Sequence, residues 1–147
     1  MEIQTGHIGL NVSDLGKSKR FYQDAFGMEL IGESEQPERR YAFLGQKGAV
    51  VLTLWQQSEG RAKHDHPGLH HLSFRVETIG EVQAAAKKLR SMDVHFQYDG
   101  IVPHSEGGKS GGIFFEDPDC IRLEIFTPSG VEENHAPVAG APSCGFF

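Results

Sequence analysis

The most constraining feature of this chain is an internal repeat that needs no gap. Residues 7–30, HIGLNVSDLGKSKRFYQDAFGMEL, align with residues 71–94, HLSFRVETIGEVQAAAKKLRSMDV. The identical pairs are His7 with His71, Val12 with Val76, Gly16 with Gly80 and Met28 with Met92. Self-similarity of this kind indicates two copies of one supersecondary unit, so the fold is expected to be built from a pair of such units.

Each copy begins with a short stretch in which apolar and polar residues alternate, as they do in a half-buried strand. A helix is expected next. Thr78 and Glu81 form a capping box in the second copy, Ser13 or Asp14 can cap the helix of the first, and Gly27 suits its end. Three further strands fit each copy, near 29–34, 40–44 and 49–56 in the first and near 94–98, 112–115 and 121–126 in the second.

The predicted fold is therefore α+β, with two βαβββ modules at residues 1–58 and 69–128. Polar, turn-rich residues 59–68 are expected to link them. Residues 129–147 form a tail rich in proline, glycine and alanine that has no periodicity. We expect this tail either to be disordered or to dock through Phe146 and Phe147.

The composition argues against several kinds of partner. The net charge is −6 and no basic run stands out, so nucleic acid is not expected to bind. No apolar stretch approaches the roughly 20 residues that a membrane helix needs, and the N-terminus lacks the apolar region of a signal peptide. We therefore expect a cytoplasmic protein with a small-molecule partner, in which Cys120 and Cys144 are not joined by a disulfide.

Alternation along the predicted strands sorts their side chains onto two faces. One face is apolar and should pack on the helices; it carries Ile8, Leu10, Val12, Val50, Leu52, Leu54, Leu72, Phe74, Val76, Leu123 and Ile125. The opposite faces would line a cup if the two sheets curl toward each other. These faces carry His7, Gly9, Asn11, Val51, Thr53, Trp55, His71, Ser73, Arg75, Arg122, Glu124 and Phe126, whereas His70 is expected on the helix side.

Three residues of the predicted cup, His7, His71 and Glu124, are candidate metal ligands. Two imidazoles and a carboxylate bind Fe(II), Mn(II), Ni(II) or Zn(II) and leave positions open for water or substrate. A single strand histidine is more often structural, but here two histidines occupy the same position of the repeat, which favours a metal site.

Strand parity alone also selects candidate substrate-binding residues, which are Asn11, Trp55, Arg75, Arg122 and Phe126. Arginine suits a carboxylate or phosphonate through paired hydrogen bonds. The two arginines could equally pair with acidic side chains.

From residue 5 to about residue 128, the chain resembles the vicinal oxygen chelate superfamily, which includes glyoxalase I, extradiol dioxygenases, fosfomycin-resistance proteins and bleomycin-binding proteins. The similar motifs are the opening strand and helix, then HHLSFRV, then FFEDPDCIRLEIFTP. The resemblance implies paired βαβββ modules that form an open, cup-shaped, eight-stranded sheet around a metal. It also implies that His7, His71 and Glu124 are the metal ligands.

Two departures from the superfamily pattern bear on the reaction. Thr53 stands where its glyoxalases have a fourth protein ligand, and a neutral hydroxyl is a poor substitute. The DPDG turn reads DPDC, so Cys120 must adopt a geometry that suits glycine or reshape the turn. Three protein ligands leave room for a chelating substrate, and the resemblance then favours an extradiol-type dioxygenase with Fe(II) as the first choice of metal.

Other readings remain open. His104 stands near the position of the dioxygenases' catalytic histidine, but Phe114 replaces their tyrosine. The second reading is a lyase or isomerase of the lactoylglutathione lyase type, which acts through an enediolate. The third is an antibiotic-resistance protein, although Gly9 replaces the threonine of fosfomycin transferases and bleomycin-binding relatives lack the ligand triad. The resemblance also implies a homodimer, since relatives often pair across exposed module edges.

Overall fold

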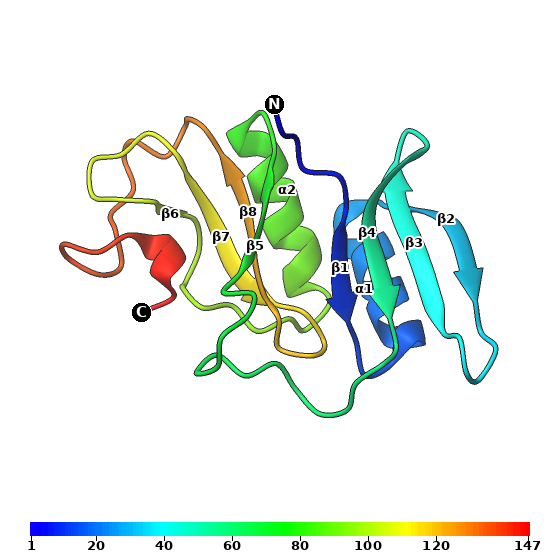
Figure 1. Cartoon of the computed structure of the whole chain (residues 1–147). Coiled ribbons are helices and arrows are strands. Elements are labelled where there is room, and N and C mark those ends of the chain that lie inside the picture. Colours follow the sequence, from blue (N-terminus) through cyan, green and yellow to red (C-terminus); the bar gives the residue numbers. More distant parts are fainter. The chain divides into compact units, whose positions relative to one another are not determined.

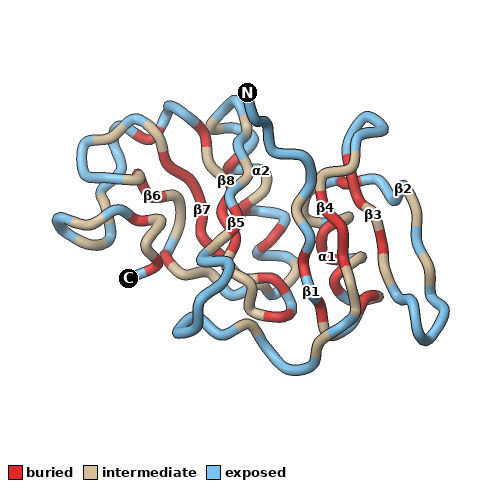
Figure 2. The backbone as a smooth tube through the Cα atoms, in the orientation of Figure 1, coloured by how far each residue is buried: buried red, intermediate tan, exposed pale blue.

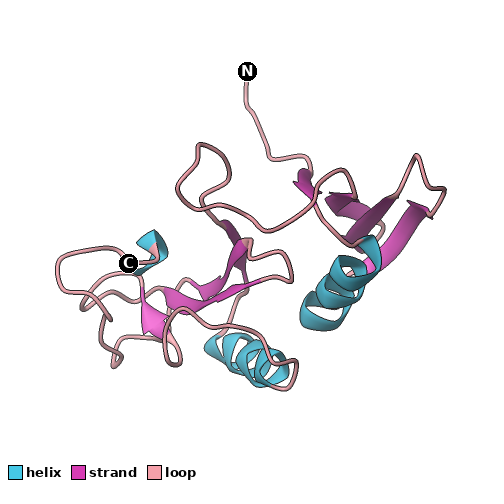
Figure 3. Ribbon diagram, turned by 90° about the horizontal axis from the view of Figure 1, so that it is seen from below, coloured by secondary structure: helices cyan, strands magenta, loops and turns pink.

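The predicted repeat is present as two units of the same topology. The computed structural model describes residues 1–147. The chain divides into the units Met1–Ala62 and Lys63–Phe147, and each unit contains one four-stranded sheet. Figure 3 shows one helix lying along one face of each sheet. The structure thus confirms the α+β class and the pair of βαβββ modules.

The first unit (blue to cyan in Figure 1) consists of β1 (Ile8–Asn11), α1 (Leu15–Phe26), β2 (Glu29–Ser34), β3 (Tyr41–Gln46) and β4 (Ala49–Trp55). Its strand order is β1-β4-β3-β2, with β1 parallel to β4 and the other neighbours antiparallel. Helix α1 packs on β3 and β4. The predicted apolar face supplies the core, in which Leu10, Val12, Leu52 and Leu54 are buried.

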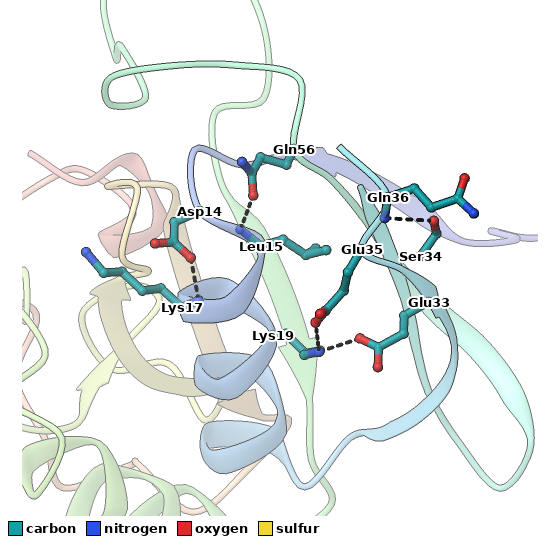
Figure 4. Close-up of polar contacts among 9 residues, drawn as sticks. All are labelled: Asp14, Leu15, Lys17, Lys19, Glu33, Ser34, Glu35, Gln36 and Gln56. Atoms are coloured by element: carbon teal, nitrogen blue, oxygen red, sulfur yellow. Dashed lines mark hydrogen bonds and ion pairs between the residues drawn. The ribbon is translucent and has the colours of Figure 1, made fainter. Parts of the chain in front are cut away.

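Side-chain contacts cap the start of α1 and join the helix to β2 (Figure 4). Of the two candidate caps, Asp14 is the one used, and its Oδ1 accepts a hydrogen bond of 2.9 Å from Lys17 N. Gln56, just after β4, accepts through Oε1 from Leu15 N at 2.8 Å. Lys19 pairs with Glu33 and Glu35, which joins the helix to the end of β2.

Gly27 ends the helix with a φ of 64°, as its place in the sequence predicts.

The second unit consists of β5 (Leu72–Arg75), α2 (Ile79–Arg90), β6 (Val102–Pro103), β7 (Gly111–Glu116), β8 (Arg122–Thr127) and a short 3-10 helix, η1 (Ser143–Gly145). The strand order is β5-β8-β7-β6, and α2 packs on β7 and β8. The predicted capping box of Thr78 and Glu81 is present. Buried residues concentrate along β7 and β8 (red in Figure 2). Neither α1 nor α2 is long and apolar enough to cross a membrane.

The strand predicted near 94–98 is wrong. Only Phe96 forms a bridge there, with Phe115 of β7, and Gln97 N donates to Phe114 O at 2.8 Å. The chain then turns at Gly100, whose φ is +83°. Strand β6 takes up the pairing further along β7, through Val102 and Pro103. The edge of β7 is therefore shared between two short segments instead of one continuous strand.

The tail docks on the second unit. Val131 and Ser143 are buried, and Phe146 is only 5% exposed, whereas Phe147 stays largely exposed. Of the two outcomes expected from the sequence, the structure shows docking, with Phe146 as the anchor.

A close contact between β7 and β8 generates a stability prediction. A Cβ atom on Gly112 would lie 1.9 Å from Ile125 O, so Gly112→Ala forces the strands apart and should lower the free energy of unfolding by about 1–3 kcal/mol. Gly80 lies in the first turn of α2, where a Cβ atom would have Thr78 Oγ1 as its nearest neighbour at 3.9 Å. Gly80→Ala should therefore leave the free energy of unfolding unchanged or raise it by up to about 1 kcal/mol. Urea denaturation of the two variants measures the difference, and equal stabilities would contradict the proposed close contact.

Candidate functional site

The centre of the candidate site is the carboxylate of Glu124. The residue lies in the middle of β8, where its register partners are Ser73 of β5 and Phe114 of β7, and it is only 2% exposed. A buried carboxylate is costly without polar partners. Here the partners are two imidazoles. His71 Nε2 lies 3.6 Å from Oε2, and His104 Nε2 forms a close hydrogen bond with Oε1.

His71 lies at the entry to β5 and is half-buried beside this carboxylate. Desolvation by burial lowers the pKa of the imidazole, and the negative charge of Glu124 opposes this effect. Near neutral pH the ring is therefore neutral, which is the form that binds a metal ion. The ring of Phe146 lies against it, with the ring centres 5.7 Å apart.

His70 does not turn to the helix side, contrary to the sequence prediction. Its Nδ1 lies 2.9 Å from His71 Nδ1, and its ring centre is 6.2 Å from that of Phe146. The reason is local. Strand β5 begins only at Leu72, so the alternation of strand side chains does not extend back to residue 70.

His104 follows β6 directly and reaches Glu124 from the other side. Its Nδ1 lies 2.8 Å from Ser110 Oγ, and its backbone N donates to Ser110 O at 2.9 Å. Both ring nitrogens are therefore engaged. A neutral imidazole carries one N–H, so when Nε2 donates to Glu124, Nδ1 accepts from the Ser110 hydroxyl. In this arrangement His104 fixes the orientation of the carboxylate.

The other predicted residues of the second unit differ in their surroundings. Arg122 and Phe126 lie on the same side of β8 as Glu124, two residues away in each direction. The Arg122 guanidinium lies 5.0 Å from the centre of the Phe146 ring. The ring centres of Phe126 and His104 are 5.2 Å apart. Arg75 is exposed, and its Nη2 lies 3.3 Å from Glu77 Oε2. Of the two roles predicted for Arg75, the structure therefore shows pairing with an acidic side chain.

In the first unit, the predicted face of β1 and β4 is well defined. A Cβ on Gly9 would lie 3.3 Å from Thr53 Oγ1, and Trp55 Nε1 donates to the same oxygen at 3.0 Å. Asn11 Oδ1 accepts from Gln57 N at 3.0 Å. His7 is exposed and precedes β1.

The strand registers make the repeat equivalence explicit. Gly9 pairs with Thr53 in the first sheet, and Ser73 pairs with Glu124 in the second. Gly9 lies two residues after His7, and Ser73 lies two residues after His71. Thr53 is therefore the counterpart of Glu124, a hydroxyl in the place of a carboxylate.

The donor types of the second unit suit a divalent metal, although no three His, Cys, Asp or Glu side chains are grouped so that they could hold an ion as they stand. His71 supplies a neutral imidazole and Glu124 supplies a charged oxygen, a combination used for first-row metals. The hydrogen bond from His104 resembles the outer contacts that orient metal-binding carboxylates.

Sequence reasoning missed two parts of the site. One is Ser110, which holds His104, and the other is Phe146, which covers His71. The only signal for Phe146 was the pair of phenylalanines that ends an otherwise aperiodic tail. Nothing in the local pattern of residue 110 points to its role, because the contact depends on the path of the loop between β6 and β7.

Comparison with known proteins identifies the family. The model of the Glyoxalase/Bleomycin resistance protein/Dioxygenase superfamily matches residues 4–125. The chain belongs to this superfamily. The matched region includes His7, His71, His104 and Glu124, and it ends before the tail that carries Phe146.

Within the superfamily, the relatives of this chain include enzymes. A lactoylglutathione lyase of Haemophilus influenzae is 33% identical over 133 residues, which cover 84% of this chain and 91% of that protein. A trivalent organoarsenical cleaving enzyme of Bacillus sp. (strain MD1) is 33% identical over 130 residues, which cover 87% of this chain and 76% of that protein.

Solved structures confirm the superfamily fold. A glyoxylase/bleomycin resistance protein/dioxygenase domain from Frankia sp. EAN1pec superposes with a TM-score of 0.71 at 23% identity, covering 86% of this chain and 98% of that one. The fosfomycin resistance protein FosX from Listeria monocytogenes, complexed with Mn(II) and sulfate, gives a TM-score of 0.64 at 23% identity, covering 90% and 98%.

The lowered pKa of His71 predicts a loss of stability in mild acid. Because the folded state resists protonation of this ring, the unfolded state binds the proton first as pH falls below the ordinary histidine pKa of about 6.5. The free energy of unfolding of the metal-free protein should therefore decrease from about pH 7.5 to about pH 5.5, and His71→Gln should flatten part of this decrease. Denaturant titrations at the two pH values measure it.

The matched control is His95→Gln, since His95 is exposed. This variant should keep the pH dependence of the parent. An unchanged pH dependence in His71→Gln would show that the environment of His71 is not as the structure places it.

Proposed function

We propose that this protein is a metal-dependent enzyme that chelates a small oxygenated substrate. The observation that carries the proposal is the buried Glu124 carboxylate flanked by the imidazoles of His71 and His104. The proposed ligands are His7, His71 and Glu124. His71 and Glu124 enter on their geometry, and His7 enters on its equivalence to His71 in the repeat and on superfamily membership.

A divalent ion in this site, Fe(II), Mn, Ni or Zn, would act as a Lewis acid toward substrate oxygens, and Fe(II) is the first choice for an oxygenase reaction. The protein groups supply the rest. His104 holds one oxygen of Glu124 and leaves Oε2 toward His71. Arg122 carries a positive charge on the same face and suits an anionic substituent of the substrate.

The sequence favoured an extradiol-type dioxygenase with a lyase or isomerase as the alternative, and we now place the lyase or isomerase class first. Support comes from the lactoylglutathione lyase relative at 33% identity. A second argument concerns His104, the candidate acid–base residue of an oxygenase. Since both of its ring nitrogens are engaged with Glu124 and Ser110, it is a positioning residue for the carboxylate instead of a free base.

Extradiol-type oxygenation is the second candidate, and it keeps the same ligand set. The two classes are separated by a screen of the metal-loaded protein against methylglyoxal–thiol adducts, catechols, trivalent organoarsenicals and fosfomycin. Isomerisation of the thiol adduct without oxygen uptake supports the first class. Ring cleavage with oxygen uptake supports the second.

Metal titration tests the ligand set. The parent protein should bind one Mn(II) ion, and His71→Ala or Glu124→Ala should weaken binding by at least the roughly 10–100-fold that loss of an outer partner costs. Equilibrium dialysis measures the dissociation constants. His66→Ala is the matched control, because this histidine is exposed and pairs with its neighbour Asp65. If His71→Ala binds as tightly as the parent, the ligand assignment is wrong.

We also propose that the protein forms a homodimer through an exposed sheet edge. Strand β2 is an edge of the first sheet, and Leu30 and Ile31 on it are 39% and 41% exposed. Exposed apolar edges favour pairing. Sedimentation at micromolar concentration should give twice the chain mass of 16.2 kDa, and Ile31→Lys should give a monomer. A monomeric parent protein would refute this proposal.

A further inference from the structure

The C-terminal segment 142–147 is attached to the chain at the end of β6, where Pro103 is followed by His104. Ser143 is 1% exposed, and its Oγ donates to Pro103 O at 2.6 Å while its N donates to His104 O at 2.9 Å. Its own carbonyl accepts from the Tyr98 hydroxyl at 2.8 Å. Ser143 thus joins the segment to two consecutive backbone carbonyl groups, those of Pro103 and His104. In Figure 1 the red end of the chain lies beside β6.

Phe146 places its ring between residues of the candidate site and the core of the second unit. The ring centres of Phe146 and Phe114 are 5.4 Å apart in an edge-to-face arrangement. On the site side, Phe146 contacts His71, His70 and the Arg122 guanidinium. Aromatic pairs and cation–π contacts of this geometry are favourable beyond the burial of area. The segment therefore touches His104 through its backbone and His71 through its side chain.

The backbone at Phe146 is in an uncommon conformation. Its φ of 57° and ψ of 42° fall in the left-handed region, which is unfavourable for a residue with a Cβ atom. Residues stay in such conformations only where surrounding contacts hold them, and they cluster at functional sites. Here the holding contacts are the hydrogen bond from Phe146 N to Ser143 O and the packing of the ring.

The segment also lies outside the region shared with the superfamily model, which ends at residue 125. Its contacts with the site therefore do not follow from the match to the superfamily model.

We propose that residues 142–147 form a fixed wall of the candidate site and that Phe146 is a positioning residue for His71. The ring fixes the plane of the imidazole and excludes water from one side of it. Ser143 holds the backbone from which His104 reaches Glu124. The wall also limits the size of a ligand that approaches His71 from the side of Phe146, so Phe146 is at the same time a candidate specificity determinant. This inference rests on the proposed function only in treating His71 and Glu124 as ligand-binding groups.

Chemical modification of the metal-free protein tests the wall without any assumption about metal or substrate. Diethyl pyrocarbonate reacts with accessible imidazoles, and mass spectrometry gives the rate for His71 relative to exposed His66 in the same molecule. Phe146→Ala should raise the relative rate at His71 by about tenfold, which corresponds to about 1.4 kcal/mol. Phe147→Ala, at the adjacent and 68% exposed phenylalanine, should leave it unchanged.

A conservative variant separates shielding from general destabilisation. Phe146→Leu keeps apolar bulk and should restore most of the protection of His71. Circular dichroism should give the same helix and strand signal for all variants, because the tail contributes only the three-residue helix η1. Ser143→Ala should raise the rate at His104 more than at His66. Equal rates at His71 in the parent and in Phe146→Ala would overturn the proposal.

A second measurement keeps this inference distinct from the proposed function. Phe146→Ala should weaken Mn(II) binding by roughly tenfold, the lower end for loss of an outer contact, while Phe147→Ala binds as the parent does. If the parent binds no metal but the modification result holds, the wall stands and the proposed function fails. If metal binds but Phe146→Ala changes neither the rate nor the affinity, the wall is refuted and the proposed function stands.

Discussion

The buried carboxylate of Glu124 is the group on which the candidate site depends. The Glu124 side chain is only 3% exposed, and a carboxylate buried to this extent is costly without polar neighbours that compensate for the lost hydration. His104 provides a close hydrogen bond to one oxygen, and His71 lies near the other. Each ring has a further contact of its own, with Ser110 behind His104 and Phe146 against His71.

The two repeats use the same framework for different purposes. In both sheets the first and last strands pair in parallel, and the counterparts Thr53 and Glu124 occupy the same place. Thr53 accepts the indole N–H of Trp55, which satisfies a buried hydroxyl within its own strand. Glu124 instead recruits imidazoles from two other segments. The charged member of the pair therefore organises its unit over long distances in sequence, whereas the neutral member needs only a local partner.

The second unit has also gained a segment that the first does not have. The tail docks through Ser143 and Phe146, and it supports the short strand β6 together with the residues around His104. Strand β6 is brief because the chain turns at Gly100 and the partner of β7 is divided. The tail thus supplies the support along this edge that a longer strand would otherwise provide.

The sequence by itself determined the repeat, the βαβββ order, the helix caps at Thr78 and Gly27, and the face of each strand on which Thr53 and Glu124 lie. These follow from local patterns, because strand alternation and capping depend on residues close together in the chain. Only the tertiary structure decided that His104 bonds to Glu124, that His70 turns toward Phe146, and that the strand near 94–98 gives way to β6. Such contacts join segments that are distant in the sequence, and their geometry depends on loop paths and on packing that no local period encodes.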